Sequence, residues 1–278
     1  MAKGSGLIGN FRGKIGNAVG YNLKDSNNKQ TQGIRIYQPI VRNPKTYAQA
    51  EQRARLAPIN ATYRLLKPII DRGQEGIAYG NKSRLAWLKT AMRTFNGGWI
   101  VKGASVNFPA IVPIANGSLG IGLQYNLPED EQIVLSVKAA EKENATFGDL
   151  SAAILAKYPT VQAGDQITFV VVGNRSDVLV AQVSSFVIDT TDTTAAPTNF
   201  SLTENELNFG LTTGHGWAGT VIVSREGSNG EHLRSVASLV CNVSRASTWM
   251  GNSAKETAVR SYMAAGTTTD WPQEPIKD

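Results

Sequence analysis

Residues able to carry catalytic chemistry are few in this sequence. It contains one cysteine, Cys241, and two histidines, His215 and His232, which lie 17 positions apart. A single cysteine excludes an internal disulfide framework and a cysteine-rich zinc site. No Gly-x-Ser-x-Gly turn, which would present a nucleophilic serine, occurs anywhere in the chain. We therefore expect no enzyme activity, no catalytic residue, no bound metal and no cofactor.

Two local patterns have a chemical interpretation that we consider and set aside. His215 stands between glycines in TGHGWAG (213–219), where a loop could expose it, but a lone loop histidine is more often incidental. The acidic run Glu129-Asp130-Glu131 follows Pro128 and is typical of a solvated turn, not of a paired acid and base. A glycine series in residues 3–24 lacks the Gly-x-x-x-x-Gly-Lys-Ser/Thr order of a phosphate-binding loop. We interpret these glycines as sites of close backbone approach in an arm or strand.

Charge is the most informative bulk property. Residues 1–104 carry a net charge of +14 (18 − 4), whereas residues 105–278 carry −8 (10 − 18). Such asymmetry favours a polyanion or an acidic protein as partner of the first segment, although a solvated basic surface is the alternative. The candidate binding residues are Arg12, Lys14, Arg53, Arg55, Arg64, Lys67, Arg84, Lys89 and Arg93.

Two helices are expected to position most of these basic residues. Asn43-Pro44 or Thr46 would begin the first helix, and Pro58 is expected to kink it. Its small face would pack against Trp87 of a second, antiparallel helix over Ser83–Met92. The small face comprises Tyr47, Ala50, Ala54, Ala57 and Ala61, and the apolar side of the second helix comprises Leu85, Trp87, Leu88 and Met92.

The remaining segments alternate with the period of strands. Ile34-Arg35-Ile36-Tyr37 would form a hairpin with residues 11–22, and strand-like runs recur from Ser118 onward. A Thr146-x-x-Asp149 capping box predicts one helix among them, and Ser253-x-x-Glu256 predicts another near the end. We expect an α+β fold: an arm and hairpin (1–42), a helical hairpin (43–104), and a mainly antiparallel, sandwich-like β body with a C-terminal helix. The body would comprise residues 105–190, a loop over 189–198, and residues 199–278.

The first hundred residues resemble an uncharacterised protein family of Bacteroidota and their phages. The resemblance lies in GKIGNAVGY, in the Ile-Arg strand, and in a pattern Asn-Pro-x-Thr-x-x-Gln-x-x-x-Arg formed here by Asn43, Pro44, Thr46, Gln49 and Arg53. The same helix module is similar to one found in phage structural proteins. The resemblance implies that the gene is associated with phage genomes, and it supplies no catalytic residue.

These observations lead to two main hypotheses for function; a third, an enzyme or lectin-like module built on the strand-rich body, has no constellation of residues to support it. The first is a non-enzymatic structural protein of a phage virion (a capsid, portal-proximal, tail or decoration component) that forms homo- or hetero-oligomers with other virion proteins. The alternative is a nucleic-acid-binding protein that uses the basic N-terminal region without regard to sequence. We find no signal peptide and no apolar run of the ~18 residues that a membrane span needs. We therefore expect no membrane partner, and location in a virion assembled in the host cytoplasm.

Overall fold

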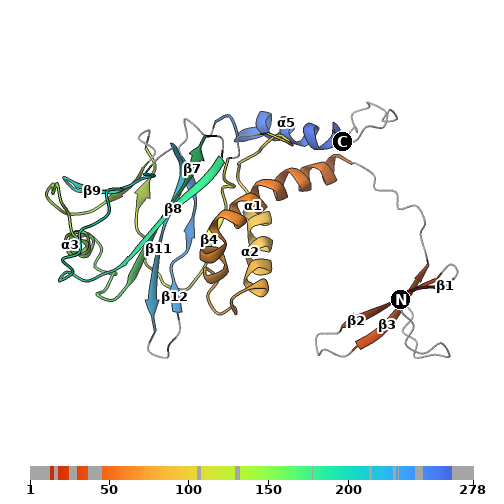
Figure 1. Cartoon of the computed structure of the whole chain (residues 1–278), viewed down its shortest axis with the longest axis horizontal. Coiled ribbons are helices and arrows are strands. Elements are labelled where there is room, and N and C mark those ends of the chain that lie inside the picture. Colours follow the sequence, from red (N-terminus) through yellow and green to blue (C-terminus); the bar gives the residue numbers. More distant parts are fainter. Residues whose placement is uncertain are drawn as a thin grey trace. The chain divides into compact units, whose positions relative to one another are not determined.

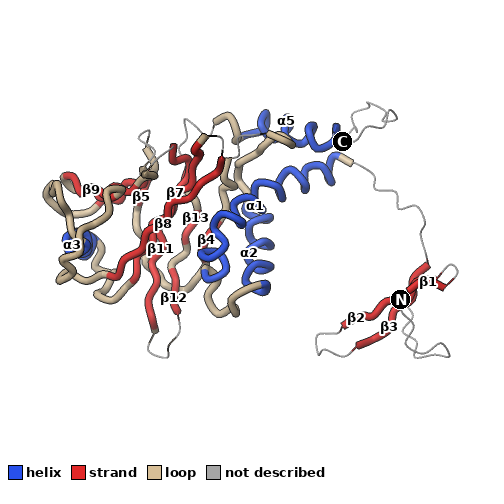
Figure 2. The backbone as a smooth tube through the Cα atoms, in the orientation of Figure 1, coloured by secondary structure: helices blue, strands red, loops and turns tan. Residues whose placement is uncertain are grey.

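The computed structural model describes residues 13–15, 18–24, 30–36, 46–104, 108–128, 132–176, 178–212, 215–227, 230, 232–241 and 247–264. Its contacts divide the chain into two units, residues 1–45 and residues 46–278. Helices and antiparallel sheets occur together, and the last described element is a helix (Figures 1 and 2). The predicted α+β class is therefore confirmed.

The first unit contains a small antiparallel sheet. Its strands are β1 (Gly13–Ile15), β2 (Ala18–Lys24) and β3 (Gln30–Ile36), in the order β1-β2-β3. The register runs from Ala18 opposite Ile36 to Lys24 opposite Gln30, so the predicted hairpin is confirmed. Gly33 lies against the ring of Tyr21, where a Cβ atom would come within 2.7 Å of a ring carbon. Ile34 and Ile36 remain exposed.

Helix α1 (Tyr47–Arg72) begins at Thr46, whose hydroxyl accepts a hydrogen bond from the backbone N–H of Gln49. The predicted kink at Pro58 is wrong, because the backbone leaves helical angles at Leu66 (φ −106°, ψ 20°) instead. The cause is Pro68. A proline ring clashes with the carbonyl four residues earlier, so the turn that precedes Pro68 has to open.

The buried face of α1 rotates along the helix. Because an α-helix turns once per 3.6 residues, residues spaced by four drift about 40° at each step. Ile59 and Asp71 are two of the eight buried positions, and the other six follow that spacing: Ala50, Ala54, Pro58, Thr62, Leu66 and Ile70. A helix with such a stripe must change its neighbour between its two ends.

The two halves of α1 do have different neighbours. Ala50 and Ala54 pack with Trp99 and with helix α5 (Gly251–Ala264). Leu66 and Ile70 pack with Trp87 of helix α2 (Asn81–Thr94). The prediction that the small face meets Trp87 is therefore wrong, since its partner comes from the far end of the chain.

Helix α2 and helix α5 also depart from expectation in detail. Ser83, Trp87 and Ala91 form the buried side of α2, whereas Leu85 is exposed, contrary to prediction. The predicted capping box of α5 is wrong because the helix begins at Gly251, which places Ser253 inside it. Glu256 instead accepts a hydrogen bond from the hydroxyl of Tyr47 on α1 (3.0 Å).

The body is built on two antiparallel sheets. The central sheet has the order β12 (His232–Arg234), β11 (His215–Glu226), β7 (Gln166–Arg175) and β8 (Val178–Val187), with β14 (Val240–Cys241) also paired to β11. The second sheet has the order β5 (Tyr125–Asn126), β6 (Ile133–Ser136), β10 (Glu206–Phe209) and β9 (Phe200–Thr203). A short pair, β4 (Pro113–Ala115) and β13 (Ala237–Ser238), lies beside the helices.

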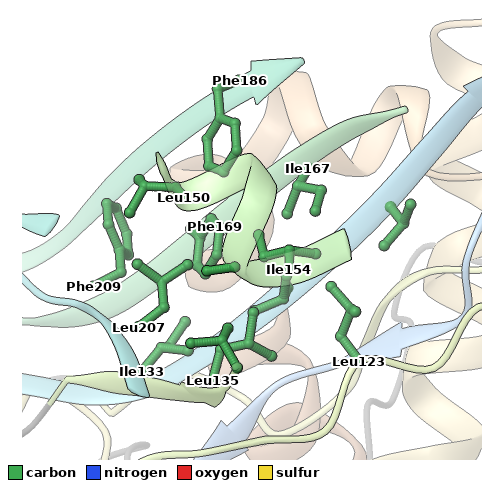
Figure 3. Close-up of a cluster of buried hydrophobic side chains, with 14 of the residues drawn as sticks. Leu123, Ile133, Leu135, Leu150, Ile154, Ile167, Phe169, Phe186, Leu207 and Phe209 are labelled. Carbon is green, nitrogen blue, oxygen red and sulfur yellow. The ribbon is translucent and has the colours of Figure 1, made fainter. Parts of the chain in front are cut away.

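Both faces of the central sheet are covered. Phe169 and Val171 of β7 face a core shared with the second sheet and with helix α3 (Phe147–Lys157), shown in Figure 3. Val170 and Val172 face a second core, shared with α1 and α2. Coverage on both sides explains why ITFVVV in this strand is almost continuously apolar, whereas a strand with one wet face would alternate. The three segments bounded at residues 104 and 190 therefore share cores within one unit.

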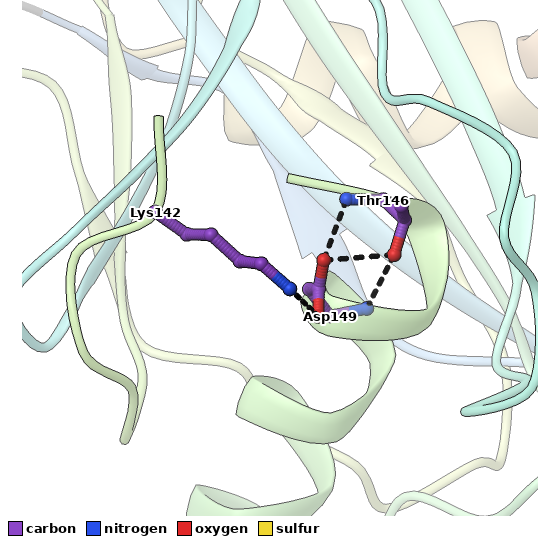
Figure 4. A network of polar contacts seen from close by, with 3 residues as sticks. All are labelled: Lys142, Thr146 and Asp149. Carbon is purple, nitrogen blue, oxygen red and sulfur yellow. Dashed lines mark hydrogen bonds and ion pairs between the residues drawn. The ribbon is translucent and has the colours of Figure 1, made fainter. Parts of the chain in front are cut away.

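Helix α3 has the predicted capping box (Figure 4). The Thr146 hydroxyl accepts from the Asp149 N–H (3.2 Å), and the Asp149 carboxylate accepts from the Thr146 N–H (2.8 Å). Lys142 adds an ion pair at 2.6 Å. Hydrogen bonds from Lys142 and Thr146 lower the pKa of Asp149 to about 2.

A buried ion pair joins the end of α3 to the central sheet. Arg225 of β11 donates from Nε and from Nη2 to the two carboxylate oxygens of Asp165, at 2.6 and 2.7 Å. The Asp165 side chain is 1% exposed and also accepts from the N–H of Gln162. Arg225 donates further to the carbonyl of Thr160. The pair thus fixes the α3–β7 connection on β11.

Candidate polyanion-binding surface

Among the described residues no group of three or more His, Cys, Asp or Glu side chains is placed to hold a metal ion. An open hollow of about 350 Å³ lies on the second sheet, and its lining within the described chain includes one carboxylate, Glu206, with no histidine or cysteine. His215 begins strand β11 instead of occupying a loop. No helix in the described ranges is long and apolar enough to cross a membrane.

The carboxylates of the helical layer, by which we mean residues 46–104, are all bound internally. Glu51 pairs with Arg55 (2.6 Å) and with Lys255 of α5 (3.0 Å). Asp71 is buried and accepts from the hydroxyl of Tyr63 (2.8 Å). Glu75 accepts from the N–H and hydroxyl of Ser118 and from the backbone N–H of Arg234. These three are the only acids of the layer.

Their environment keeps the negative charges inside the protein. Hydrogen bonds from Ser118 lower the pKa of Glu75. Burial by itself would raise the pKa of Glu51, but hydrogen bonds from Lys255 and Arg55 outweigh burial and lower it. Desolvation, and then the hydrogen bond to Asp71, raise the pKa of Tyr63, so its hydroxyl stays protonated and continues to donate. Glu51 and Glu75 are therefore charged at neutral pH but committed to partners within the fold.

The basic residues of the same layer outnumber these acids. The layer contains ten Lys and Arg residues and three acids (10 − 3 = +7). Within the described chain, Arg55 is the only one of these ten bases that forms an ion pair, and its partner is Glu51. The positive charge is consequently left on the exposed side of the helices.

Helix α2 presents the clearest part of this surface. Its buried side is Ser83, Trp87 and Ala91, and at 100° per residue Lys82, Lys89 and Arg93 fall on the opposite side. All three are exposed. The helix contains no acid, so nothing on α2 offsets their charge. Lys82 was not among the predicted residues, although its spacing of seven from Lys89 places both on one face.

The predicted residues of α1 are not equivalent. Arg64 and Lys67 are exposed on the second half of the helix. Arg53 is half-buried. Arg55 points about 200° away from Arg53 around the helix, pairs with Glu51, and lies over the ring of Trp99 at 5.9 Å. Arg55 is thus part of the packing between α1 and its neighbours.

Two arginines lie over aromatic rings at the junction of the helices. Arg84 is exposed and stands 5.0 Å from the centroid of the Tyr63 ring. Arg72 is exposed and stands 5.8 Å from that of Tyr79, and it too was missed from the sequence. Of the two predicted residues in the first unit, Arg12 lies outside the described residues. Lys14 belongs to strand β1, and its side chain is not described.

The geometry therefore keeps four of the predicted residues and adds Lys82. We define the basic face as the exposed cations of α1 and α2 that, within the described chain, neither form an ion pair nor lie over an aromatic ring: Arg64, Lys67, Lys82, Lys89 and Arg93. No family model matches the chain, and no curated protein or solved structure matches it either.

Proposed function

We propose that this protein is a non-enzymatic structural component of a phage particle whose basic face binds a polyanion, most simply the packaged nucleic acid. The observation that carries the proposal is the division of charge in the helical layer. All three carboxylates are bonded inward, and within the described chain the five cations of the basic face remain exposed without an ion pair. Fixed cations on a rigid helical layer attract phosphate groups without reading bases.

The structural part of the proposal rests on a different set of observations. The segments GKIGNAVGY and Asn43 to Arg53 resemble phage-associated proteins, which is an argument from association. The first unit adds a physical reason: its small three-stranded sheet leaves Ile34 and Ile36 exposed, and burying their side chains against another surface would stabilise it. Contact with other virion proteins would supply that surface.

The proposal is tested by titrating nucleic acid at several salt concentrations. Fluorescence anisotropy with duplex DNA of mixed sequence should show affinity that is independent of sequence and falls steeply with salt. Five phosphate contacts at about 0.9 each give a slope of log K against log salt of up to about −4.5. Changing Lys67, Lys89 and Arg93 together to Gln should reduce the magnitude of that slope by about 2.7.

A matched control separates a specific face from net charge alone. Lys138, Lys157 and Arg175 are exposed cations of the β body, so changing all three to Gln removes the same charge elsewhere. We expect this control variant to keep the wild-type slope of log K against log salt, apart from a small decrease in its magnitude caused by the lower net charge. Equal losses in the two triple variants would contradict a basic face, and absence of binding in the wild type at low salt would reject the polyanion role.

A further inference from the structure

Strand β8 is an edge of the central sheet. It pairs with β7 in an unbroken register from Gln166 opposite Val187 to Arg175 opposite Val178. In the part of the chain that the structure describes, no strand pairs with its other side. Along this ten-residue strand the backbone N–H and C=O groups of alternate residues therefore point to an open edge (Figures 1 and 2).

This edge lacks the features that usually block pairing with another chain. Natural edge strands are short, bulged, or carry lysine, proline or inward-pointing charge. The sequence VLVAQVSSFV has no charged residue and no proline, and its register with β7 contains no bulge. Val183 is 43% exposed and Val187 is 50% exposed.

One face of β8 is covered over half of its length. Alternate residues of a strand share a face, so 179, 181, 183, 185 and 187 point toward the helical layer. Leu179 and Ala181 pack against the core beneath α1 and α2. Val183 and Val187, farther along the same face, stay open to solvent. The covered and open halves lie at opposite ends of the strand.

An antiparallel second copy of β8 matches this arrangement. When the pair is centred on Val183, Val183 lies opposite itself, Leu179 lies opposite Val187, and Ala181 lies opposite Ser185. The open half of each strand then lies beside the covered half of the other, and both exposed valines meet apolar partners. The register keeps like faces together, as a two-fold axis perpendicular to the sheet requires.

From these observations we infer that β8 is a self-pairing strand, through which two copies of this protein join their central sheets into one continuous sheet. The partner is a second copy because the same ten uncharged residues supply both sides of the contact. Chains with a net charge of +6 repel one another in general, but no like charges meet along this edge. The inference does not depend on the basic face.

Sedimentation velocity of the full chain over a range of concentrations tests self-association. We expect a monomer–dimer equilibrium that Val183→Lys weakens at least tenfold, because two lysines would then face each other across the two-fold axis. Val236→Lys is the control, since Val236 is 65% exposed between β12 and β13 and takes no part in the contact. Melting temperatures of both variants verify that the fold is intact.

Cross-linking tests the register, and it keeps the inference testable should Val183→Lys fold poorly. In a Cys241→Ser background, Val183→Cys should be joined efficiently by a short bis-maleimide. Val178→Cys should not, because the two copies of residue 178 would lie ten residues apart along the strands, or about 33 Å. A chain that stays monomeric, a dimer insensitive to Val183→Lys, or cross-linking at 178 in place of 183 would each overturn the inference. Salt-dependent nucleic-acid binding by Val183→Lys should be unchanged, so failure here leaves the proposed function standing.

Discussion

Replacing Asp165 by Asn tests whether the buried ion pair holds the body together. The substitution keeps the size of the side chain but removes its charge, which leaves the Arg225 guanidinium without a counter-ion. Removing one partner of a buried pair typically costs about 3–5 kcal/mol. Here 24% of the Arg225 side chain is exposed, so water can solvate part of the charge, and the amide oxygen still accepts one hydrogen bond. We therefore expect a loss of about 2–3 kcal/mol.

Urea unfolding followed by circular dichroism measures this loss. The double variant Asp165→Asn/Arg225→Gln should be less destabilised than the sum of the two single variants, by about 1 kcal/mol or more, because neither then leaves a charge unpaired. Lys142→Gln removes one partner of a pair at the exposed start of α3 and should cost less than about 1 kcal/mol. If the free energy of unfolding of Asp165→Asn lies within about 0.5 kcal/mol of the wild-type value, the ion pair does not stabilise the fold in the way described.

Two further predictions concern helix packing and acid stability. Ala54→Leu should destabilise the fold by about 1–3 kcal/mol in thermal unfolding, because Ala54 is fully buried against Trp99 and α5. Ala48→Leu, on the exposed side of α1, should be near neutral in the same assay. Similar effects of the two substitutions would contradict the assignment of Ala54 to the buried side of α1. Because the folded pKa of Asp149 is lowered from 3.8 to about 2, its contribution is complete above about pH 4 and is lost as the pH falls toward 2. After allowance for the exposure of this side chain, we expect its charge to contribute about 1 kcal/mol to the free energy of unfolding. In urea unfolding, the difference in stability between wild type and Asp149→Asn should therefore shrink as the pH falls over that range. A difference that stays constant with pH would argue that the charged capping box is not the source of this stability.

Features governed by nearby residues could be predicted from the sequence. The capping box of Thr146 and Asp149 joins positions three apart, and the hairpin of β2 and β3 follows from alternation around a polar turn. Thr46 was recognised as a possible cap, and the structure uses it. In each case the determining contacts lie within about twenty residues of one another.

Features that depend on distant segments could not be predicted. The partner of Ala50 and Ala54 is α5, some two hundred residues away, so nothing near α1 indicates it. The same holds for Arg55, which looks like an exposed cation in sequence but is held by Glu51 and Trp99. Lys82 is a different case, because helical spacing alone places it on the same side of α2 as Lys89. The division of α1 at Leu66 was misplaced because two prolines compete for it and sequence does not rank them.

The rotating stripe of α1 has a consequence for the order of folding during synthesis. The second half of the helix can pack as soon as α2 has been made, but the first half has to wait for α5, because the Tyr47–Glu256 contact spans 209 positions. At about 5–20 residues per second, the delay is roughly 10–40 s. Throughout that interval Ala50 and Ala54 have only part of their final cover, and Glu51 lacks its Lys255 partner. The N-terminal half of α1 thus waits for α5, although α1 leaves the ribosome before every other described element of the second unit.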